Sequence, residues 1–256
     1  FGYDPERPIL RNISFVAEPG QTIALVGPTG SGKTSITALA HRFYDVQEGS
    51  ITIDGYDIRD VMQESIGDVM GMVLQEPFLF SKPVLENVRY NTLDATREDV
   101  VTACKVIGAH DFVMQLDNGY DTTLEQRGSN LSVGQRQLLS FARALVADPK
   151  ILVLDEATAN IDSYTERIIQ DALKKLLAGR TALVIAHRLS TIRNADRIIV
   201  VRDGEITETG THVELVASDG LYAQLWKTNY ASFDDIADNA DAIAAETVRA
   251  VQGMRC

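Results

Sequence analysis

The sequence contains no run of about 20 apolar residues, the length that a helix needs to cross a bilayer. It also has no secretory signal peptide at its start. We therefore predict no membrane-spanning helix within these 256 residues. A chain of this length fits one substantial domain, or a core that carries an inserted lobe.

Basic residues are too few for a broad nucleic-acid surface. The chain has 24 Lys and Arg against 36 Asp and Glu, which gives a formal net charge of −12. A nucleic-acid surface needs clustered positive charge, so this balance argues against one. It still permits a local anion site built from backbone N–H groups.

Cysteine is scarce, and the two present, Cys104 and Cys256, form no metal-ligand spacing. This usage favours a reducing compartment. The sequence has no internal repeat and no low-complexity segment. It begins at Phe1, without an initiator Met, in residues that we expect to form a strand. We therefore expect a piece of a longer protein.

Short apolar runs predict the strands of an α/β core. They cover residues 21–27, a run ending at Gln75, residues 150–155 and residues 181–187, and helical patterns alternate with them. This alternation predicts a largely parallel sheet. Asp-Gly turns predict two hairpins, in residues 50–58 and 197–210.

Between Glu76 and Pro149 helical patterns replace the strand-like runs. Residues 97–116 are typical of one helix, and the run after Val133 places apolar residues at helical spacing. We predict a helical lobe, residues 76–149, inserted into a core of residues 1–75 and 150–215. Residues 216–256 would form a helical tail. From Phe233 the tail is amphipathic, and it packs on the core or contacts a second chain.

A glycine-rich loop lies between the first predicted strand and helix. Its pattern, G-x-x-x-x-G-K-T, lets backbone N–H groups point at phosphate oxygens, while Lys33 reaches the β- and γ-phosphates and the Thr34 hydroxyl ligates Mg²⁺. A structural glycine turn is the alternative. The expected nucleotide contacts are Gly27, Pro28, Thr29, Gly30, Ser31, Gly32, Lys33, Thr34 and Ser35.

Two acidic residues follow the apolar run "ILVL". Asp155 would stand at the carboxyl end of a buried strand, where ligands bind in open α/β sheets, and could hold Mg²⁺ through water. Glu156 can orient or deprotonate an attacking water. Without the phosphate loop, the pair would be typical of a solvated strand end.

Two other polar residues end predicted strands near the same edge. His187 ends a strand that we expect beside the Asp155 strand, which favours a γ-phosphate contact over a structural role. Gln75 can ligate Mg²⁺ there, although taken alone it is an ordinary loop glutamine.

Six motifs in this order resemble the nucleotide-binding domain of the ATP-binding cassette (ABC) transporters, over nearly the whole chain. They are the phosphate loop "GPTGSGKT", the Q-loop "VLQEPFLF", the signature "LSVGQRQ", the Walker B motif "ILVLDEA", the D-loop "ATANID" and the switch "IAHRLS". The stretches "RFYDVQEGSITIDGYDIR" and "FARALVADPKILVLDEAT" are similar to the exporter branch, in which the domain follows a six-helix membrane domain. The resemblance implies an α/β P-loop NTPase (RecA-like) core with a mixed sheet, an antiparallel β subdomain and an inserted helical subdomain.

The resemblance also implies roles for single residues. Tyr3 would stack on adenine, unless it is a core aromatic. Ser132, Gly134 and Gln135 of the signature would touch the ATP held by a second nucleotide-binding domain, and Asp162 would lie along that head-to-tail interface. The resemblance thus implies two ATP, Mg²⁺, ATPase activity, a fused transmembrane domain, and a place on the cytoplasmic face of the cell membrane.

Two positions depart from the family pattern. Val133 replaces the first glycine of the signature Leu-Ser-Gly-Gly-Gln, and a β-branched side chain restricts the backbone where a phosphate must come close. Gln126 replaces an acidic residue that contacts the membrane domain. Since Lys33, Asp155 and Glu156 are intact, we favour a heterodimer with one strong and one weak ATPase site. A homodimer that tolerates Val133 remains the alternative.

Two other function classes stay open on these residues alone. A P-loop kinase or small GTPase would share the phosphate loop, but the signature and the switch histidine argue against it. A soluble ABC-type ATPase acting on nucleic acid or ribosomes would share all six motifs, but the acidic charge and the exporter-like stretches oppose it.

Overall fold

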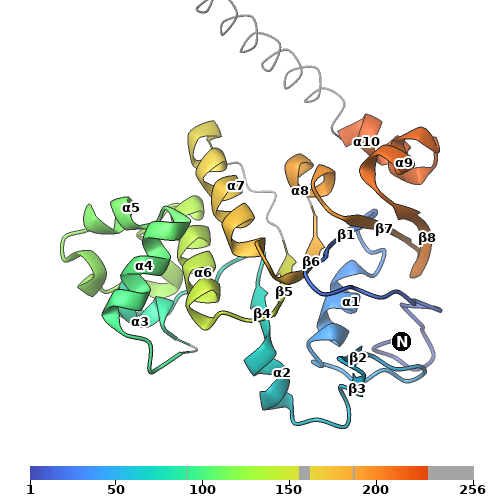
Figure 1. Cartoon of the computed structure of the whole chain (residues 1–256), viewed down its shortest axis with the longest axis horizontal. Helices are drawn as coiled ribbons and strands as arrows, with labels where there is room; N and C mark the ends of the chain where they lie inside the picture. The colour runs from blue at the N-terminus through green and yellow to red at the C-terminus, as the bar shows by residue number, and fades with distance from the viewer. Residues whose placement is uncertain (91, 156–161, 187, 230–256) are drawn as a thin grey trace, which may run out of the picture.

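A six-stranded mixed sheet forms the centre of the molecule (Figure 1). The computed structural model describes residues 1–90, 92–155, 162–186 and 188–229. The strand order is β4-β5-β6-β1-β7-β8, with parallel pairing throughout except for the antiparallel β7–β8 edge. The strands are β1 (Thr22–Val26), β4 (Met70–Val73), β5 (Ile151–Asp155), β6 (Thr181–Ile185), β7 (Arg197–Arg202) and β8 (Glu205–Gly210).

The central strands are continuous apolar runs because both faces of the sheet are covered. In β1, Ile23 and Leu25 enter one core cluster, and Ala24 and Val26 enter the other. The strands β5, β6 and β7 alternate in the same way. Parallel strands buried on both faces have this unbroken apolar pattern, so the runs identified in the sequence are confirmed as strands.

Two groups of helices cover the faces of the sheet. On one face α1 (Lys33–Ala40) and α2 (Gln63–Val69) supply core residues, and on the other face α7 (Ser163–Leu177) and α8 (Leu189–Arg193) do so. Two further helices, α9 (His212–Ala217) and α10 (Leu221–Asn229), follow the β8 edge of the sheet (Figure 1).

A helical lobe extends from the β4 edge of the sheet (Figure 1). Its longest helices, α4 and α6, pack on each other and on α7. The lobe consists of α3 (Val84–Val88), α4 (Arg97–Ile107), α5 (His110–Met114) and α6 (Val133–Ala147), with 3-10 turns at Gly119–Asp121 and Gln126–Gly128.

A small antiparallel pair completes the predicted architecture. Strands β2 (Thr52–Ile53) and β3 (Tyr56–Asp57) pair across the Asp54-Gly55 turn. The mixed sheet, the antiparallel pair and the helical lobe together confirm the predicted fold class.

Two local predictions are wrong. Phe1 lies in no strand: its backbone bonds to Ile9 and Leu10, because the chain folds back on itself around the Asp4–Arg7 bridge. Residues 97–116 form two helices instead of one, since Gly108 takes a left-handed φ of 83° and caps α4.

In the four described ranges, no helix combines the length and the apolar character needed to cross a membrane. The amphipathic helix predicted from Phe233 onward lies outside these ranges.

Candidate functional site

The predicted phosphate loop connects the carboxyl end of β1 to the first turn of α1. Its glycines Gly27, Gly30 and Gly32 all have positive φ, of 154°, 81° and 106°. Close packing adds a second constraint at Gly27, where a Cβ would come within 2.0 Å of the carbonyl oxygen of Val201 in β7. The loop is therefore curled and held tightly against the sheet.

The side chain of Lys33 lies inside this loop. Its Nζ donates to the carbonyl oxygens of Gly27, at 2.8 Å, and Pro28, at 2.9 Å. Burial lowers the pKa of Lys33, while the nearby carboxylate of Asp155 partly offsets that effect. The loop thus holds the positive charge of Lys33 among its own backbone groups, and this arrangement suits an anionic ligand.

The remaining loop residues differ in their exposure. Pro28, Thr29 and Thr34 are exposed, whereas Ser31 and Ser35 are buried. The carbonyl oxygen of Ser31 accepts a bond from the N–H of Gly204. The Thr34 hydroxyl, at the first turn of α1, is thus accessible to a bound ligand.

Asp155 is the last residue of β5 and lies beside Ile185, the last residue of β6. Gln75 follows β4 by two residues and is exposed. The strand β6, which leads to His187, therefore lies beside β5, which ends at Asp155, as predicted. The next strand in the sheet is β1, and the phosphate loop follows its carboxyl end. Glu156 and His187 themselves lie outside the described residues.

The oxygen donors at this edge of the sheet fit a magnesium ion whose remaining ligands are phosphate oxygens. Among the described residues, no cluster of three or more His, Cys, Asp or Glu could hold a metal. In the same described part of the chain, this edge offers the carboxylate of Asp155 and the hydroxyl of the exposed Thr34. Mg²⁺ commonly binds through one or two carboxylates plus substrate phosphates, so Thr34 and Asp155 suit that role, with Gln75 as a further oxygen donor.

Tyr3 belongs to an aromatic cluster next to the loop. Its ring lies 5.1 Å from Phe1 and 4.8 Å from Tyr44, edge to face in both cases. The Tyr3 hydroxyl is 3.2 Å from the Oγ of Ser35. The ring is half exposed, so the structure brings Tyr3 to the phosphate-loop helix and leaves part of its surface available for stacking.

The signature residues form the start of α6. The N-cap Ser132 accepts a bond from the N–H of Gln135, and the Gln135 side chain accepts one from the N–H of Ser132. This is a capping box. Val133 is the first helical residue and is not among the residues with positive φ, so its position requires no glycine.

The first turns of α6 and α7 pack against each other beside Asp162. Asp162 is the N-cap of α7, and backbone N–H groups of Thr165 and Tyr164 bond its carboxylate and lower its pKa. Gly134 is buried against Thr165. The structure thus brings the signature and the start of α7 together, whereas in the described residues no hydrogen bond joins Ser132 or Gln135 to the phosphate loop.

The sequence analysis assigned no role to a partly buried polar cluster between α6, α7 and α8. Arg188 donates hydrogen bonds there to the side chains of Glu166 and Gln137. Arg188 lies within the motif "IAHRLS" and Gln137 ends the motif "LSVGQRQ", and membership of these motifs is the sequence signal that could have identified them.

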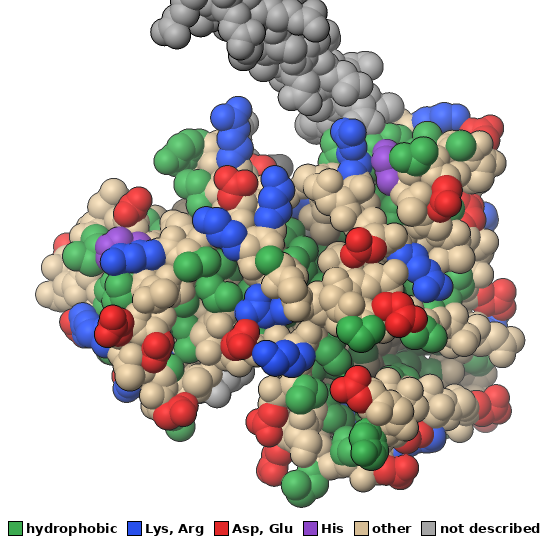
Figure 2. Space-filling model, in the orientation of Figure 1, with side chains coloured by type: hydrophobic (Ala, Val, Ile, Leu, Met, Phe, Trp, Pro, Cys, Tyr) green, Lys and Arg blue, Asp and Glu red, His purple; other side chains and the backbone are tan. Residues whose placement is uncertain are grey.

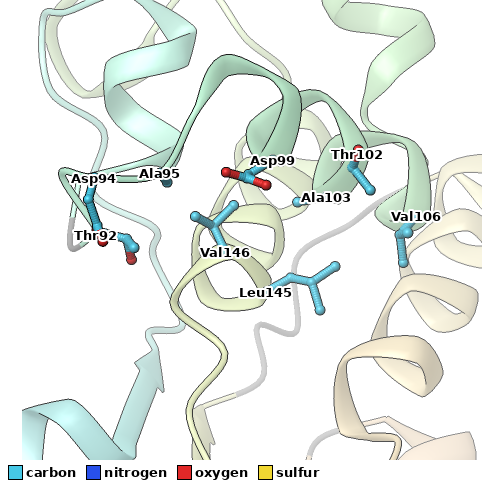
Figure 3. A pocket seen from close by; sticks show the side chains of 9 residues that line it. All are labelled: Thr92, Asp94, Ala95, Asp99, Thr102, Ala103, Val106, Leu145 and Val146. Carbon is cyan, nitrogen blue, oxygen red and sulfur yellow. The ribbon is translucent and has the colours of Figure 1, made fainter.

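A separate cavity of about 420 Å³ lies in the helical lobe between α4 and the end of α6 (Figure 3). Its lining includes the carboxylates of Asp94 and Asp99 together with the apolar Leu145 and Val146, and it contains no Lys or Arg. In the part of the chain that the structure describes, a lining of this charge does not favour phosphate binding.

Comparison with protein families places the motifs in a known group. The family described as "ABC transporter" matches residues 10–159. The ABC transporter ATP-binding protein YknV of Bacillus subtilis is 53% identical over 232 residues, which cover 91% of this chain and 38% of that protein. The beta-(1→2)glucan export ATP-binding/permease protein NdvA of Nitrobacter winogradskyi is 48% identical over 252 residues, covering 98% of this chain and 41% of that protein.

A solved structure shows the same fold. The structure of a bacterial Atm1-family ABC exporter with ATP bound aligns with a TM-score of 0.84 and 43% sequence identity, covering 90% of this chain and 40% of that one. The chain thus spans about two fifths of the length of the relatives it matches.

Proposed function

The chain belongs to the ABC transporter family, as an ATP-binding and ATP-hydrolysing domain, and on this premise we propose that it is the motor of a membrane exporter. The observation that carries the proposal is the placement of Lys33. Its buried ammonium lies within the curled loop and next to Asp155, at the edge where the strands β1, β5 and β6 end.

The residues at this edge divide the chemistry between them. Lys33 and the loop N–H groups from Thr29 to Thr34 bind the triphosphate. Thr34, Asp155 and Gln75 would hold Mg²⁺, which would supply positive charge to the phosphates. Glu156 orients and deprotonates the attacking water.

Two further contacts complete the proposed nucleotide site. His187 contacts the γ-phosphate, and the half-exposed ring of Tyr3 stacks on adenine. Ser35 holds the Tyr3 hydroxyl.

Two such domains would close on two ATP molecules. Ser132, Gly134 and Gln135 lie at the N-terminal end of α6, where the helix dipole favours an anion. In a head-to-tail dimer this end meets the partner's γ-phosphate, with Asp162 beside it. Closure on ATP and opening after hydrolysis would then move the attached membrane helices.

A matched pair of variants tests the site in the isolated chain. Lys33→Ala should abolish ATP binding, whereas Lys105→Ala, an exposed change in α4, should leave the dissociation constant unchanged. Fluorescence titration with a labelled ATP measures both. Equal ATP affinity of the Lys33→Ala chain and the wild type would refute the assignment.

A second pair separates binding from turnover. In the whole transporter, Glu156→Gln should retain ATP binding while steady-state hydrolysis falls by about 100-fold or more, the usual effect of losing a general base. The exposed change Glu98→Gln in α4 is the control. Hydrolysis at the wild-type rate in Glu156→Gln would sink the role given to Glu156.

Export is favoured over action on nucleic acid by the surface and by the relatives. Figure 2 shows acidic and basic side chains interspersed on one face, with no continuous basic field, in keeping with the net charge of −12. The relative NdvA combines ATP binding and a permease in one protein. We therefore place the chain on the cytoplasmic face of a membrane, beside a fused permease domain that contacts the segment around Gln126.

We propose a heterodimer in which this chain supplies Lys33, Asp155 and Glu156 to the stronger site. Since Val133 has helical backbone geometry, its N–H remains available, and any weakening of the partner's site comes from side-chain bulk. Nucleotide trapping in the whole transporter tests this proposal. Equal hydrolysis at the two sites, unchanged by Val133→Gly, would favour the homodimer instead.

A further inference from the structure

Arg188 joins three elements through one buried guanidinium. It lies at the start of α8, directly after the predicted switch residue His187, and its side chain is 8% exposed. One nitrogen donates to the Oε1 of Glu166 in α7 at 2.7 Å, and another donates to the Oε1 of Gln137 in α6 at 3.2 Å. The planar fork of arginine suits two simultaneous acceptors, which a lysine ammonium on a flexible stem does not reproduce.

The acceptors are themselves held in place. The Oε1 of Glu166 also accepts from the Nε2 of Gln170 at 2.9 Å. Gln170 in turn contacts the hydroxyl of Ser190 in α8. The bonds thus run from α8 through α7 and back to α8, so the orientation of the Glu166 carboxylate is fixed from two sides.

Each bonded residue is close in sequence to a residue of the proposed dimer interface. Gln137 is five residues after Ser132 of the signature, and Glu166 is four residues after Asp162, the N-cap of α7. One turn away, Gly134 lies against Thr165, so the same two helices are in direct contact at their first turns. Arg188 therefore connects the switch segment to the part of the molecule that presents the signature and Asp162.

We propose that Arg188 is a positioning residue for ATP hydrolysis. This inference rests on the function proposed above. The Arg188 guanidinium fixes the backbone beside His187 relative to α6 and α7, so that the switch, the signature and Asp162 move as one unit. We assign it no contact with ATP or with the reacting water. Loss of its bonds should therefore lower kcat and leave ATP binding to the phosphate loop intact.

The test uses the whole transporter with the substitutions Arg188→Gln and Arg188→Lys. Arg188→Gln should lower kcat by about 100-fold, the scale expected when catalytic groups are displaced by about 1 Å, while the ATP dissociation constant stays within about twofold of the wild type, because binding to the ground state is kept. Arg188→Lys keeps the pairing with Glu166 and loses the bond to Gln137. Its kcat should therefore lie between that of the wild type and that of Arg188→Gln. If Arg188→Gln fails to fold, Arg188→Lys provides the test on its own.

The matched control is Arg180→Lys. Arg180 is also largely buried and bonded, to Asp148 and to the carbonyl oxygen of Leu176, but it lies beyond the C-terminal end of α7, just before β6. This change should lower the urea midpoint without changing kcat per folded molecule. If the Arg188 variants behave in the same way, with a lower midpoint and an unchanged kcat, Arg188 is merely structural and the inference is overturned.

A second comparison separates this inference from the proposed function. If Lys33→Ala abolishes ATP binding while both Arg188 variants hydrolyse ATP at the wild-type rate, only the role of Arg188 fails. If Lys33→Ala binds ATP normally, the nucleotide site itself is misassigned.

Glu166→Gln should lower kcat, as Arg188→Gln does. The double variant should lose no more kcat than the more affected single variant, since both substitutions remove the same interaction. Additive losses would overturn the shared role.

Discussion

Gly134 lies so close to Thr165 that a Cβ at position 134 would come within 2.3 Å of the Cγ2 of Thr165. Glycine in the first turn of α6 is therefore a packing requirement. Alanine has the higher helix propensity, by about 1 kcal/mol, but here overpacking outweighs that gain. We expect Gly134→Ala to lower the free energy of unfolding by about 1–2 kcal/mol in urea titrations, within the range for added bulk in a packed core.

A second substitution shows whether this contact is the cause. Thr165→Ser removes the Cγ2 and keeps the backbone N–H that bonds to Asp162. In the Gly134→Ala background it should restore most of the lost stability. The coupling free energy from the double-mutant cycle measures the contact, and a coupling near zero would place the defect elsewhere.

Asn87 holds the segment after the predicted Q-loop in place. It is 1% exposed. Its Nδ2 donates to the carbonyl oxygens of Phe80, Lys82 and Pro83, and its Oδ1 accepts from the N–H of Phe80. Asn87→Ala leaves these buried groups unpaired, so the free energy of unfolding should fall by about 1–3 kcal/mol.

Hydrogen exchange provides the local readout for this variant. The Phe80 amide should exchange faster in Asn87→Ala, because its acceptor is lost. The exposed change Asn118→Ala should shift stability by less than about 0.5 kcal/mol. Unchanged protection at Phe80 would contradict the role of Asn87.

The strands and their shared edge could be predicted because apolar runs and strand ends are local features. The run before Asp155 is buried on both faces, so it is continuous, and its neighbour β6 ends beside it. The start of the chain was predicted wrongly, since the Phe1 backbone bonds to Ile9 and Leu10 rather than to a sheet. That folding back depends on a turn around Asp4 and Arg7, which an apolar pattern does not encode.

Contacts between distant residues explain the rest. Arg188 and Gln137 are 51 residues apart in the sequence, yet they share a hydrogen bond. No periodicity predicts such a pair. Val133 shows the converse: the sequence suggested that glycine was needed, but the capping box at Ser132 makes the next residue the first of a regular helix. A β-branched residue fits that backbone at little cost.

His41 should make the stability of the fold depend on pH. Burial lowers its pKa from 6.5 to about 4, and in the described residues neither ring nitrogen has a hydrogen-bond partner. Between pH 6.5 and about 4 the unfolded chain binds a proton that the folded chain does not. Stability is therefore lost as the pH falls through this window, by roughly 3 kcal/mol when the whole shift is counted.

The variant His41→Leu isolates this contribution. It removes the titrating group and keeps an apolar side chain of similar size. Urea midpoints between pH 7.5 and 5 should then fall less steeply than in the wild type. Parallel pH profiles for the two proteins would show that His41 titrates normally or is accessible in the folded state.

Cys104 should resist thiol reagents while the chain is folded. Its side chain is fully buried in α4, and burial raises the pKa of the thiol to about 11, which a hydrogen bond with Tyr120 only partly offsets. The thiolate is the reactive form, and at pH 8 it would be only about one thousandth of the total at such a pKa.

A Cys256→Ser background leaves Cys104 as the sole thiol. In the folded chain a chromogenic disulfide reagent should react with Cys104 only at the rate of local opening, whereas in urea it should react stoichiometrically. Rapid labelling of the folded chain would mean that α4 opens readily or packs differently from this structure.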